Sequence, residues 1–295
     1  MSPSALKRAL LRCCTCWDSI RLLDWIDRKG LQHLFFHHLR YRVTPAMLER
    51  ALAAPPAERA RLYALATSYL KVDNTYKTTG LDRTRLADGL LLELAREFDA
   101  PRLLEVGVSD GSSALNLLAR RDVFAEVVLT DRFSRFLQRR FPLGRAFLDA
   151  EGRRFGLKFL CLYVWLSPGR TVDPQGYAPI EVVNPRVREA FGVPAIRRFD
   201  LFRDALDRPV QLIKCANILN LAYFDAATIR RALDNLARSL APGGYVVLSQ
   251  NNAKYPGDEA ALVLRREADG FRPVRNVNGH ELAALFPDAP APETA

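Results

Sequence analysis

The chain has 295 residues, of which 49% are hydrophobic and 26% are charged, the balance of a globular protein and not of a disordered or fibrous one. Lysine and arginine number 43 against 33 acidic residues, so the formal net charge is +10. This excess permits an anionic partner, such as a nucleic acid, a membrane surface or an acidic substrate, but composition alone does not choose between them.

Cysteine usage and the longest apolar run indicate the compartment. Five cysteines, with three of them within residues 13–16, do not have the spacing of a secreted disulfide framework. The amino terminus lacks the apolar stretch of a signal peptide, and the longest apolar run, residues 159–166, is far shorter than the ~20 residues that span a bilayer. We therefore expect a cytoplasmic protein without a transmembrane helix.

A metal site is not predicted. Cys13 and Cys16 lie near one another on a predicted helix, and His33, His37 or His38 are available as further zinc ligands. However, the cysteine pair does not recur, and Cys13 belongs to an apolar stripe, where a free cysteine behaves as a small hydrophobic residue.

Helical periodicity dominates the first 80 residues. Apolar residues from Leu6 to Leu23 recur at steps of three and four, which predicts an amphipathic helix that ends at Gly30. Further helices are predicted at 33–41, 44–53 and up to about residue 70, followed by a polar, turn-rich segment at 71–80. We expect residues 1–80 to form a helical cap.

From residue 82 the pattern changes. A helix at 82–98 leads into short buried strands that alternate with helices, which is typical of a parallel sheet with crossover helices. Strands are predicted at 102–108, 125–131, 209–216 and 245–249, with helices at 112–121, 133–141 and 225–240 and a resumed rhythm at 195–202.

The carboxyl-terminal part departs from this rhythm. Residues 261–266 and 271–277 flank Ala268-Asp269-Gly270, which predicts a β-hairpin. Only a short segment separates the strand at 245–249 from the next one, too short for the usual crossover helix, so we expect this end of the sheet to be rearranged.

Residues 142–194 interrupt the alternation with several arginines, prolines and glycines and contain the longest apolar run. We interpret them as an insertion. The expected organisation is therefore a helical cap at 1–80, a main domain at 81–285 that contains this insertion, and a flexible tail rich in proline and alanine at 286–295.

Residues 103–113, LLEVGVSDGSS, predict a buried strand, a turn of small residues and the start of a helix. Gly107 and Gly111 have no side chain, so a ligand can approach the backbone of the turn closely. Asp131 follows 20 residues after Gly111, where a doubly wound sheet places the acid that binds both hydroxyls of an adenosine ribose. NAD is disfavoured, because the G-x-G-x-x-G pattern is absent and Asp110 would repel a diphosphate.

Glu105-x-Gly107-x-Ser109-x-Gly111 resembles the E/D-x-G-x-G-x-G motif of class I S-adenosylmethionine-dependent methyltransferases, with serine at the middle glycine. Asp131 matches the family's acid after its second strand. Phe199-Asp200-Leu201 resembles its adenine-side segment, and residues 240–244, LAPGG, resemble its L-x-P-G-G turn. The resemblance covers about residues 81–277. It implies an α/β fold with a Rossmann-like sheet and helices on both faces, and S-adenosyl-L-methionine as the cofactor.

Residues 212–224 are similar, more narrowly, to a segment of chemotaxis-receptor methyltransferases in which an asparagine begins a short helical turn that ends in Tyr-Phe. That asparagine lines the cofactor pocket, so the likeness implies the same role for Asn217. The spacing is two residues longer and Ala216 replaces an arginine, so the protein-carboxylate substrate is not carried over. The resemblances together imply these cofactor-binding residues: Glu105, Gly107, Ser109, Gly111, Asp131, Asp200, Leu201 and Asn217.

The reaction expected from this cofactor is transfer of a methyl group to an O or N nucleophile on a small molecule. The protein would supply orientation, desolvation and a proton acceptor. Asn220 and Tyr223, at the carboxyl end of a predicted strand, are the candidate catalytic residues, and residues 250–252 lie at a second such end. Residues 76–78, Tyr-Lys-Thr, are candidate lid residues.

Other functions stay open. Because Ser109 replaces the middle glycine of the motif, a non-catalytic methyltransferase-like binding subunit is an alternative. Methylation of RNA is an alternative, but nucleic acid is not favoured, because no basic surface interleaved with aromatic residues is evident. The insertion mixes Lys158 with large apolar residues and suits a pocket wall, a buried segment or peripheral contact with an anionic membrane. The net charge thus points to an anionic acceptor or surface that the cap and the insertion would meet.

Overall fold

The structure is a computed structural model that describes residues 14–72, 75–77, 79–80, 82–120, 122–166, 170–193 and 195–295. The chain divides into two compact units. Unit 1 combines Met1–Gly80 with Phe133–Ile196, and unit 2 combines Leu81–Arg132 with Arg197–Ala295. The amino-terminal segment and the insertion, which are far apart in the sequence, therefore belong to the same unit.

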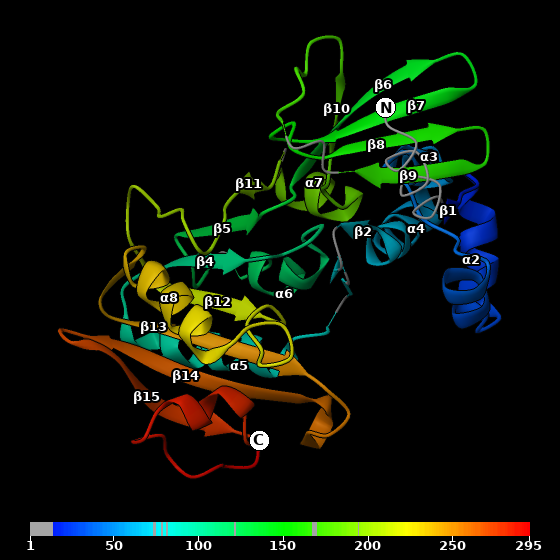
Figure 1. The fold of residues 1–295 in the computed structure, drawn as a ribbon. Helices are drawn as coiled ribbons and strands as arrows, with labels where there is room; N and C mark the ends of the chain where they lie inside the picture. The colour runs from blue at the N-terminus through cyan, green and yellow to red at the C-terminus, as the bar shows by residue number, and fades with distance from the viewer. Residues whose placement is uncertain are drawn as a thin grey trace. The chain divides into compact units, whose positions relative to one another are not determined.

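Unit 2 contains a seven-stranded sheet of order β11-β5-β4-β12-β13-β14-β15 (Figure 1). Its strands are β4 (Arg102–Val106), β5 (Glu126–Asp131), β11 (Arg197–Arg198), β12 (Val210–Ala216), β13 (Leu240–Asn251), β14 (Glu259–Glu267) and β15 (Gly270–Val277). The first five strands in this order are parallel, whereas β14 and β15 are antiparallel to their neighbours. The expected α/β sheet, its hairpin at the end and its rearranged carboxyl-terminal part are confirmed.

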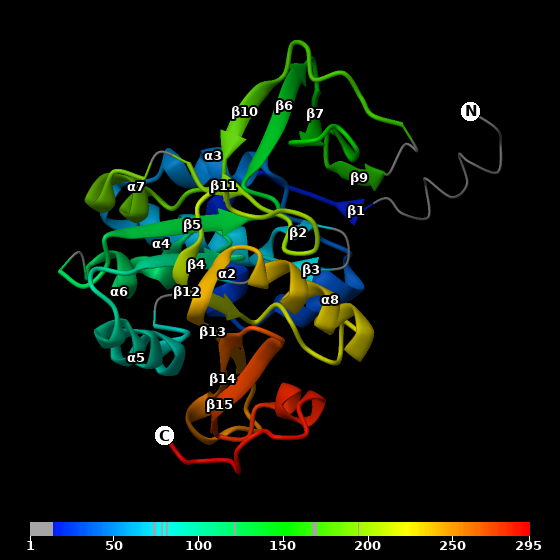
Figure 2. The same ribbon diagram turned by 90° about the vertical axis from the view of Figure 1, so that its left-hand side faces the viewer.

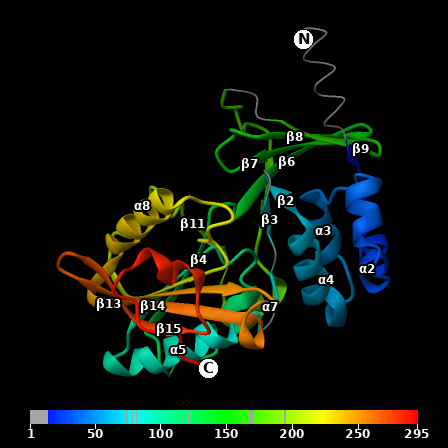
Figure 3. The ribbon, with the colours of Figure 1, turned by 60° about the horizontal axis from the view of Figure 1, so that its bottom comes forward.

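Helices lie on both faces of this sheet. Helix α5 (Arg85–Leu94) covers one face and helix α8 (Ala226–Ala237) the other (Figures 2 and 3). Leu103 and Leu212 pack in the cluster of α5, whereas Leu104 and Ile213, one position further along the same strands, pack in the cluster of α8. Because both faces are covered, these strands are apolar at successive positions, the pattern from which they were predicted.

Short helices complete unit 2. They are η2 (Ala95–Glu97), η3 (Ser112–Ala114), α6 (Leu115–Leu118), η4 (Pro256–Asp258) and η5 (Glu281–Leu285). The helix expected at 112–121 is thus present only as η3 and the single turn α6. The segment expected to resume the rhythm at 195–202 contributes only the two residues of β11 to the sheet.

Unit 1 contains a six-stranded antiparallel sheet of order β1-β9-β8-β7-β6-β10. Its strands are β1 (Cys14–Thr15), β6 (Arg135–Phe141), β7 (Gly144–Asp149), β8 (Phe155–Phe159), β9 (Leu162–Leu166) and β10 (Ala178–Glu181). Its other elements are α2 (Ile20–Arg28), the π-helical turn η1 (Leu34–His38), α3 (Ala46–Leu52), α4 (Pro56–Tyr69), the paired strands β2 (Lys71–Val72) and β3 (Thr75–Tyr76), and α7 (Pro185–Phe191). Among the described residues, no helix is long and apolar enough to cross a membrane.

The helices and the sheet of unit 1 share one core. Met47 and Tyr63, from the amino-terminal helices, are fully buried in the same cluster as Phe136 and Phe147, from the sheet. The phenol of Tyr63 also donates a hydrogen bond of 2.7 Å to the carbonyl of Glu181 in β10. This shared core explains why the amino-terminal segment and the insertion form one unit.

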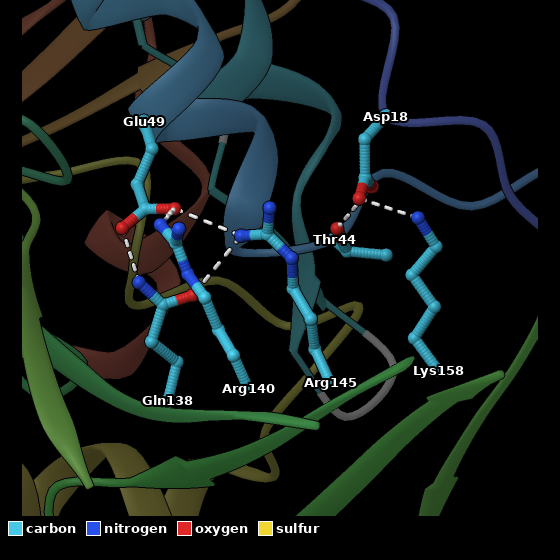
Figure 4. A network of polar contacts seen from close by, with 7 residues as sticks. All are labelled: Asp18, Thr44, Glu49, Gln138, Arg140, Arg145 and Lys158. Carbon is cyan, nitrogen blue, oxygen red and sulfur yellow. Dashed lines mark hydrogen bonds and ion pairs between the residues drawn. The ribbon is translucent and has the colours of Figure 1, made fainter. Parts of the chain in front are cut away.

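A polar network joins the same two parts (Figure 4). Glu49 of α3 accepts hydrogen bonds from Arg145 at 2.8 Å, from Arg140 at 2.9 Å and from Gln138. Asp18 accepts a hydrogen bond of 3.0 Å from the hydroxyl of Thr44 and pairs with Lys158. Figure 4 shows these carboxylates pointing from the amino-terminal segment towards the strands.

The helix predicted at 133–141 is wrong, because β6 occupies Arg135–Phe141. The alternation of apolar and polar residues that marks a strand is interrupted in β6, because the polar residue Gln138 occupies a buried position beside Glu49. The insertion therefore begins at Phe133, earlier than the expected 142–194.

The boundaries expected near both ends also change. Within the described part of the predicted 6–23 helix, Cys14–Thr15 is a strand, and α2 begins only at Ile20 after an N-cap from Ser19. At the other end, the last part of the tail at 286–295 makes specific contacts. Glu293 forms a bridge with Val277 of β15 and an ion pair of 2.7 Å with Arg275.

Candidate functional site

The carboxyl ends of β5, β4, β12 and β13 lie at one edge of the unit 2 sheet, because these four strands are neighbours and parallel. Ligands of open α/β sheets bind at this edge. Most of the predicted cofactor-binding residues gather here: the loop at 107–111 follows β4, Asp131 ends β5, and Asn217 follows β12.

The loop after β4 has an unusual backbone. Gly107, Ser109 and Gly111 all have left-handed conformations, with φ of 70°, 59° and 85°. Glycine adopts this conformation without steric cost, whereas serine does so rarely. Ser109 therefore has a backbone conformation that glycine adopts more readily than serine.

Asp131 contacts this loop directly. Its Oδ2 accepts a hydrogen bond of 2.9 Å from the backbone N–H of Ser109, and Asp131 is 7% exposed. The backbone N–H groups of Gly107 and Val108 donate to the carbonyl of Thr130, at 2.7 and 3.0 Å. The glycine loop and the acid predicted to bind a ribose are thus held together.

Gly107 faces the side chain of Ile218, which follows β12. A Cβ at position 107 would lie 2.2 Å from Cδ1 of Ile218, a separation that no side chain could occupy without displacing the isoleucine. A side chain at position 107 would displace the end of Ile218 and would be strained in this left-handed backbone, so the structure favours glycine here. Ile218 is also the side chain that a ligand approaching this glycine would meet.

Glu105 belongs to a buried group of charges. Nζ of Lys214, in β12, lies 2.9 Å from Oε1 of Glu105 and 2.7 Å from Oδ1 of Asp88, in α5. Ser113 donates a further hydrogen bond of 3.3 Å to Oε1. Oε2 of Glu105 is buried and receives no hydrogen bond from the described residues.

The titration of this group reflects burial and mutual attraction. Burial raises the pKa of Glu105 above its usual value, although the charge of Lys214 opposes this shift. Burial acts to lower the pKa of Lys214, but the attraction of Glu105 and Asp88 outweighs it, so that pKa is raised. Lys214 therefore stays a cation whose charge both carboxylates share.

Sequence reasoning missed Lys214. The available indication was a single lysine within the apolar strand 210–216, since a buried charge is rare unless it is paired. The pairing itself depends on register: Lys214 lies directly opposite Glu105 across β12 and β4.

Asn217 links the ends of two strands. Its side-chain amide donates to Oδ1 of Asn251 at 2.7 Å, and the backbone N–H of Asn251 donates to Oδ1 of Asn217 at 2.8 Å. Asn217 has a left-handed backbone, with φ of 60°. A ligand that contacts Asn217 would therefore lie next to the hydrogen-bonded pair Asn217 and Asn251.

Asp200 and Leu201 lie in the turn after β11. Oδ1 of Asp200 accepts a hydrogen bond of 3.0 Å from the N–H of Phe202, and Oδ2 lies 3.7 Å from Nε of Arg132. Leu201 is buried in the core, and its carbonyl accepts a hydrogen bond of 2.9 Å from Asn235. Both residues thus have structural roles, and their contact with a cofactor stays a prediction.

The candidate catalytic residues differ in exposure. Asn220 is 5% exposed, and its Oδ1 accepts hydrogen bonds from the backbone N–H groups of Ala222 and Tyr223, at 3.1 and 3.0 Å. Tyr223 is 68% exposed. Asn220 therefore shapes the turn that carries Tyr223, and of the two only Tyr223 presents its side chain to solvent.

The remaining candidates are dispersed. Gln250 accepts a hydrogen bond of 3.0 Å from the phenol of Tyr255. Tyr76 and Lys77, proposed as lid residues, are in unit 1, and Thr78 lies outside the described residues, as does Cys13. Cys16 is 1% exposed in the unit 1 core. In the part of the chain that the structure describes, no three His, Cys, Asp or Glu side chains form a group that could hold a metal ion.

No protein-family model and no curated protein sequence matches this chain. Several solved structures match part of it. They include the N-methyltransferase NodS from Bradyrhizobium japonicum WM9 in complex with S-adenosyl-L-homocysteine, at 17% identity over 68% of this chain and 70% of that chain, with a TM-score of 0.33. An S-adenosylmethionine-dependent methyltransferase from Clostridium acetobutylicum ATCC 824 is 11% identical over 66% of this chain and 72% of its own, with a TM-score of 0.36. The sugar N-methyltransferase KedS8 from Streptoalloteichus sp ATCC 53650 is 17% identical over 70% of this chain and 78% of its own, with a TM-score of 0.32.

Proposed function

We propose that this protein is an S-adenosylmethionine-dependent methyltransferase that acts on an O or N nucleophile of a small molecule. The observation that carries the proposal is the contact between Asp131 and the loop at 107–111, at 2.9 Å from the N–H of Ser109. A carboxylate at the end of the strand beside a glycine turn is the arrangement that binds the hydroxyls of an adenosine ribose. The absence of side chains at Gly107 and Gly111 lets the ligand approach the backbone.

The charges near this edge suit a cationic cofactor. Asp131 would hold the ribose, and the loop backbone would border the rest of the ligand. Oε2 of Glu105 is a buried acceptor without a donor among the described residues, which an ammonium group would satisfy. When bound, S-adenosylmethionine would supply a methyl group that its sulfonium already activates.

The chain would then orient the acceptor next to the cofactor. Asn220 acts as a positioning residue, because its Oδ1 fixes the backbone that carries Tyr223. The exposed phenol of Tyr223 is the group proposed to contact the acceptor. The formal net charge of +10 favours an anionic acceptor. We expect residues 220–224 to determine which acceptor is used.

Titration calorimetry with S-adenosylmethionine and S-adenosylhomocysteine tests the proposal. We expect binding in the micromolar range, weakened about tenfold by Asp131→Asn and further by Asp131→Ala. Asparagine retains an acceptor for the N–H of Ser109, so it separates loss of charge from loss of the loop contact. Asp207→Ala is the matched control, because Asp207 is a 96% exposed acid in unit 2. Absence of heat with folded wild-type protein would overturn the proposal.

A second candidate, a non-catalytic binding subunit, is favoured by the contact of Ile218 with Gly107. If Ile218 stays in place, it restricts access to the glycine. Ile218→Ala would then bind S-adenosylhomocysteine more tightly than the wild type. Methyl transfer from labelled cofactor to a small-molecule extract distinguishes the two candidates: cofactor binding without turnover on any fraction favours the second.

A further inference from the structure

Two turns of unit 1 lie side by side at one end of its sheet. The β6–β7 turn is at 142–143 and the β8–β9 turn is at 160–161, and both occupy the same end because the strands alternate in direction (Figure 1). The backbone N–H of Leu160 donates a hydrogen bond of 2.9 Å to the carbonyl of Leu143. The two turns therefore form one continuous surface.

This surface is apolar and exposed. Leu143 is 67% exposed, Leu160 57%, Leu162 48%, Phe159 47% and Phe141 37%. We call these five residues the apolar tip. A single exposed leucine needs no explanation, but five large apolar side chains on two linked turns form a contiguous patch of the kind that marks an interaction site.

The backbone of the tip shows that folding alone does not favour these residues. Leu143 and Leu160 have left-handed conformations, with φ of 64° and 52°. Glycine or asparagine suits such a position in a turn, whereas leucine is sterically disfavoured. Both leucines are thus unfavourable for the turn conformation and for contact with water, unless a partner removes them from water.

The charge around the tip indicates which partner. Arg139 and Arg140 are exposed at the end of β6, directly before Phe141. Arg139, Arg140, Arg145 and Lys158 lie in the parts of the strands next to the tip, where Lys158 pairs with Asp18. The acids Asp149 and Glu151 lie near the β7–β8 turn at the opposite end of the strands, together with Arg153 and Arg154. Glu49 pairs with Arg140 and Arg145 together, so a positive charge remains. Protruding apolar side chains beside exposed arginines are complementary to the surface of an anionic bilayer.

We propose that the apolar tip inserts into the interfacial region of an anionic membrane, with Arg139 and Arg140 contacting lipid phosphates. Insertion transfers Leu143 and Leu160 from water to an apolar environment, which offsets their unfavourable backbone conformation. The inference does not depend on the proposed methyl transfer. The proposal assigns the membrane contact that the sequence suggested for the insertion to its β6–β7 and β8–β9 turns.

Co-sedimentation of the full chain with vesicles tests the proposal. We expect binding to phosphatidylcholine vesicles that contain phosphatidylglycerol, weaker binding to phosphatidylcholine alone, and a decrease as salt is raised. The double variant Leu143→Asn/Leu160→Asn should lower the partition coefficient about tenfold or more. Because asparagine suits both turns, its thermal midpoint should equal or exceed that of the wild type. A loss of binding without a loss of stability excludes a merely structural role for these leucines.

Leu221→Asn is the matched control, since Leu221 is 44% exposed in unit 2, and it should bind vesicles as the wild type does. Three results would overturn the proposal. They are no sedimentation of the wild type with anionic vesicles, equal sedimentation of the double variant, and self-association of the wild type that the double variant abolishes. The last result, measured by analytical ultracentrifugation, would identify the tip as a contact between copies of the chain.

Discussion

Two groups of charges, one in each unit, differ in their exposure to water. In unit 2, the side chains of Lys214, Glu105 and Asp88 are 0%, 3% and 6% exposed, and each lies between the sheet and α5. In unit 1, Glu49 and Arg140 form an ion pair with side chains 29% and 64% exposed. Water can replace a lost partner in the second case but not in the first. Similar ion pairs should therefore contribute very differently to stability.

The largest effect is expected from Lys214→Met. The substitution preserves the length of the side chain but leaves Glu105 and Asp88 buried without their cation. We expect the free energy of unfolding in urea to fall by about 3–5 kcal/mol. Lys254→Met is the control, because Lys254 pairs with Glu281 while its side chain is 49% exposed. Equal losses in the two variants would contradict the difference between buried and exposed pairs.

A smaller and pH-dependent effect is expected from His280, which is 2% exposed in unit 2. Its Nδ1 accepts a hydrogen bond of 3.2 Å from the N–H of Leu282, and burial lowers its pKa to about 4. Since the unfolded state binds the proton more readily, the stabilisation is present above the unfolded pKa of 6.5 and is lost as the pH falls through the folded pKa. Between these values the loss amounts to about 3 kcal/mol.

Urea unfolding at several pH values, for the wild type and His280→Asn, measures this contribution. Asparagine keeps an acceptor for Leu282 but does not titrate in this range. Carboxylates that titrate in both proteins cancel in the difference between them. The stability difference should therefore change by about 3 kcal/mol on acidification, and identical pH profiles would show that His280 does not titrate as a buried group.

The smallest effect is expected from Glu49→Gln in unit 1. Glutamine retains an acceptor for one of the neighbours Gln138, Arg140 and Arg145 but removes the charge. We expect a loss of about 1 kcal/mol in the free energy of unfolding. Glu58→Gln, at an ion pair whose side chains are 65% and 38% exposed, is the control and should cause no measurable change. A loss as large as that of Lys214→Met would contradict the comparison between the units.

Sequence patterns predicted unit 2 better than unit 1 for a physical reason. Strands buried on both faces, such as β4 and β12, are apolar at successive positions and can be recognised without knowledge of their neighbours. The alternation of strands and helices predicts a helix at 133–141, and the polar residue Gln138 at a buried position conceals the strand pattern of β6. That position is polar because Glu49, about 90 residues earlier in the chain, lies beside it.

The candidate site shows the same division. The glycines of the loop at 107–111 and the acid Asp131 were predicted by spacing, because a strand, a turn and the next strand form a local unit. Lys214 was not, since its partners come from β4 and α5. The sequence also did not reveal the structural roles of Asp200 and Asn220. The same residue types, Asp and Asn, cap turns and bind ligands, so residue type does not distinguish the two roles.

Local patterns in the sequence were enough to predict the strands and helices at 82–131 and 209–277, the glycine turn and the acid that follows it, because these depend on local spacing and burial. The three-dimensional fold was needed to show that residues 14–72 and the insertion share one core, that Glu105 is paired with Lys214, and that two turns join into an apolar tip. Each of these depends on contacts between segments far apart in the chain, which no local pattern encodes. The same holds for the net charge of +10, because the fold shows which charged side chains are buried in ion pairs and which are exposed to solvent.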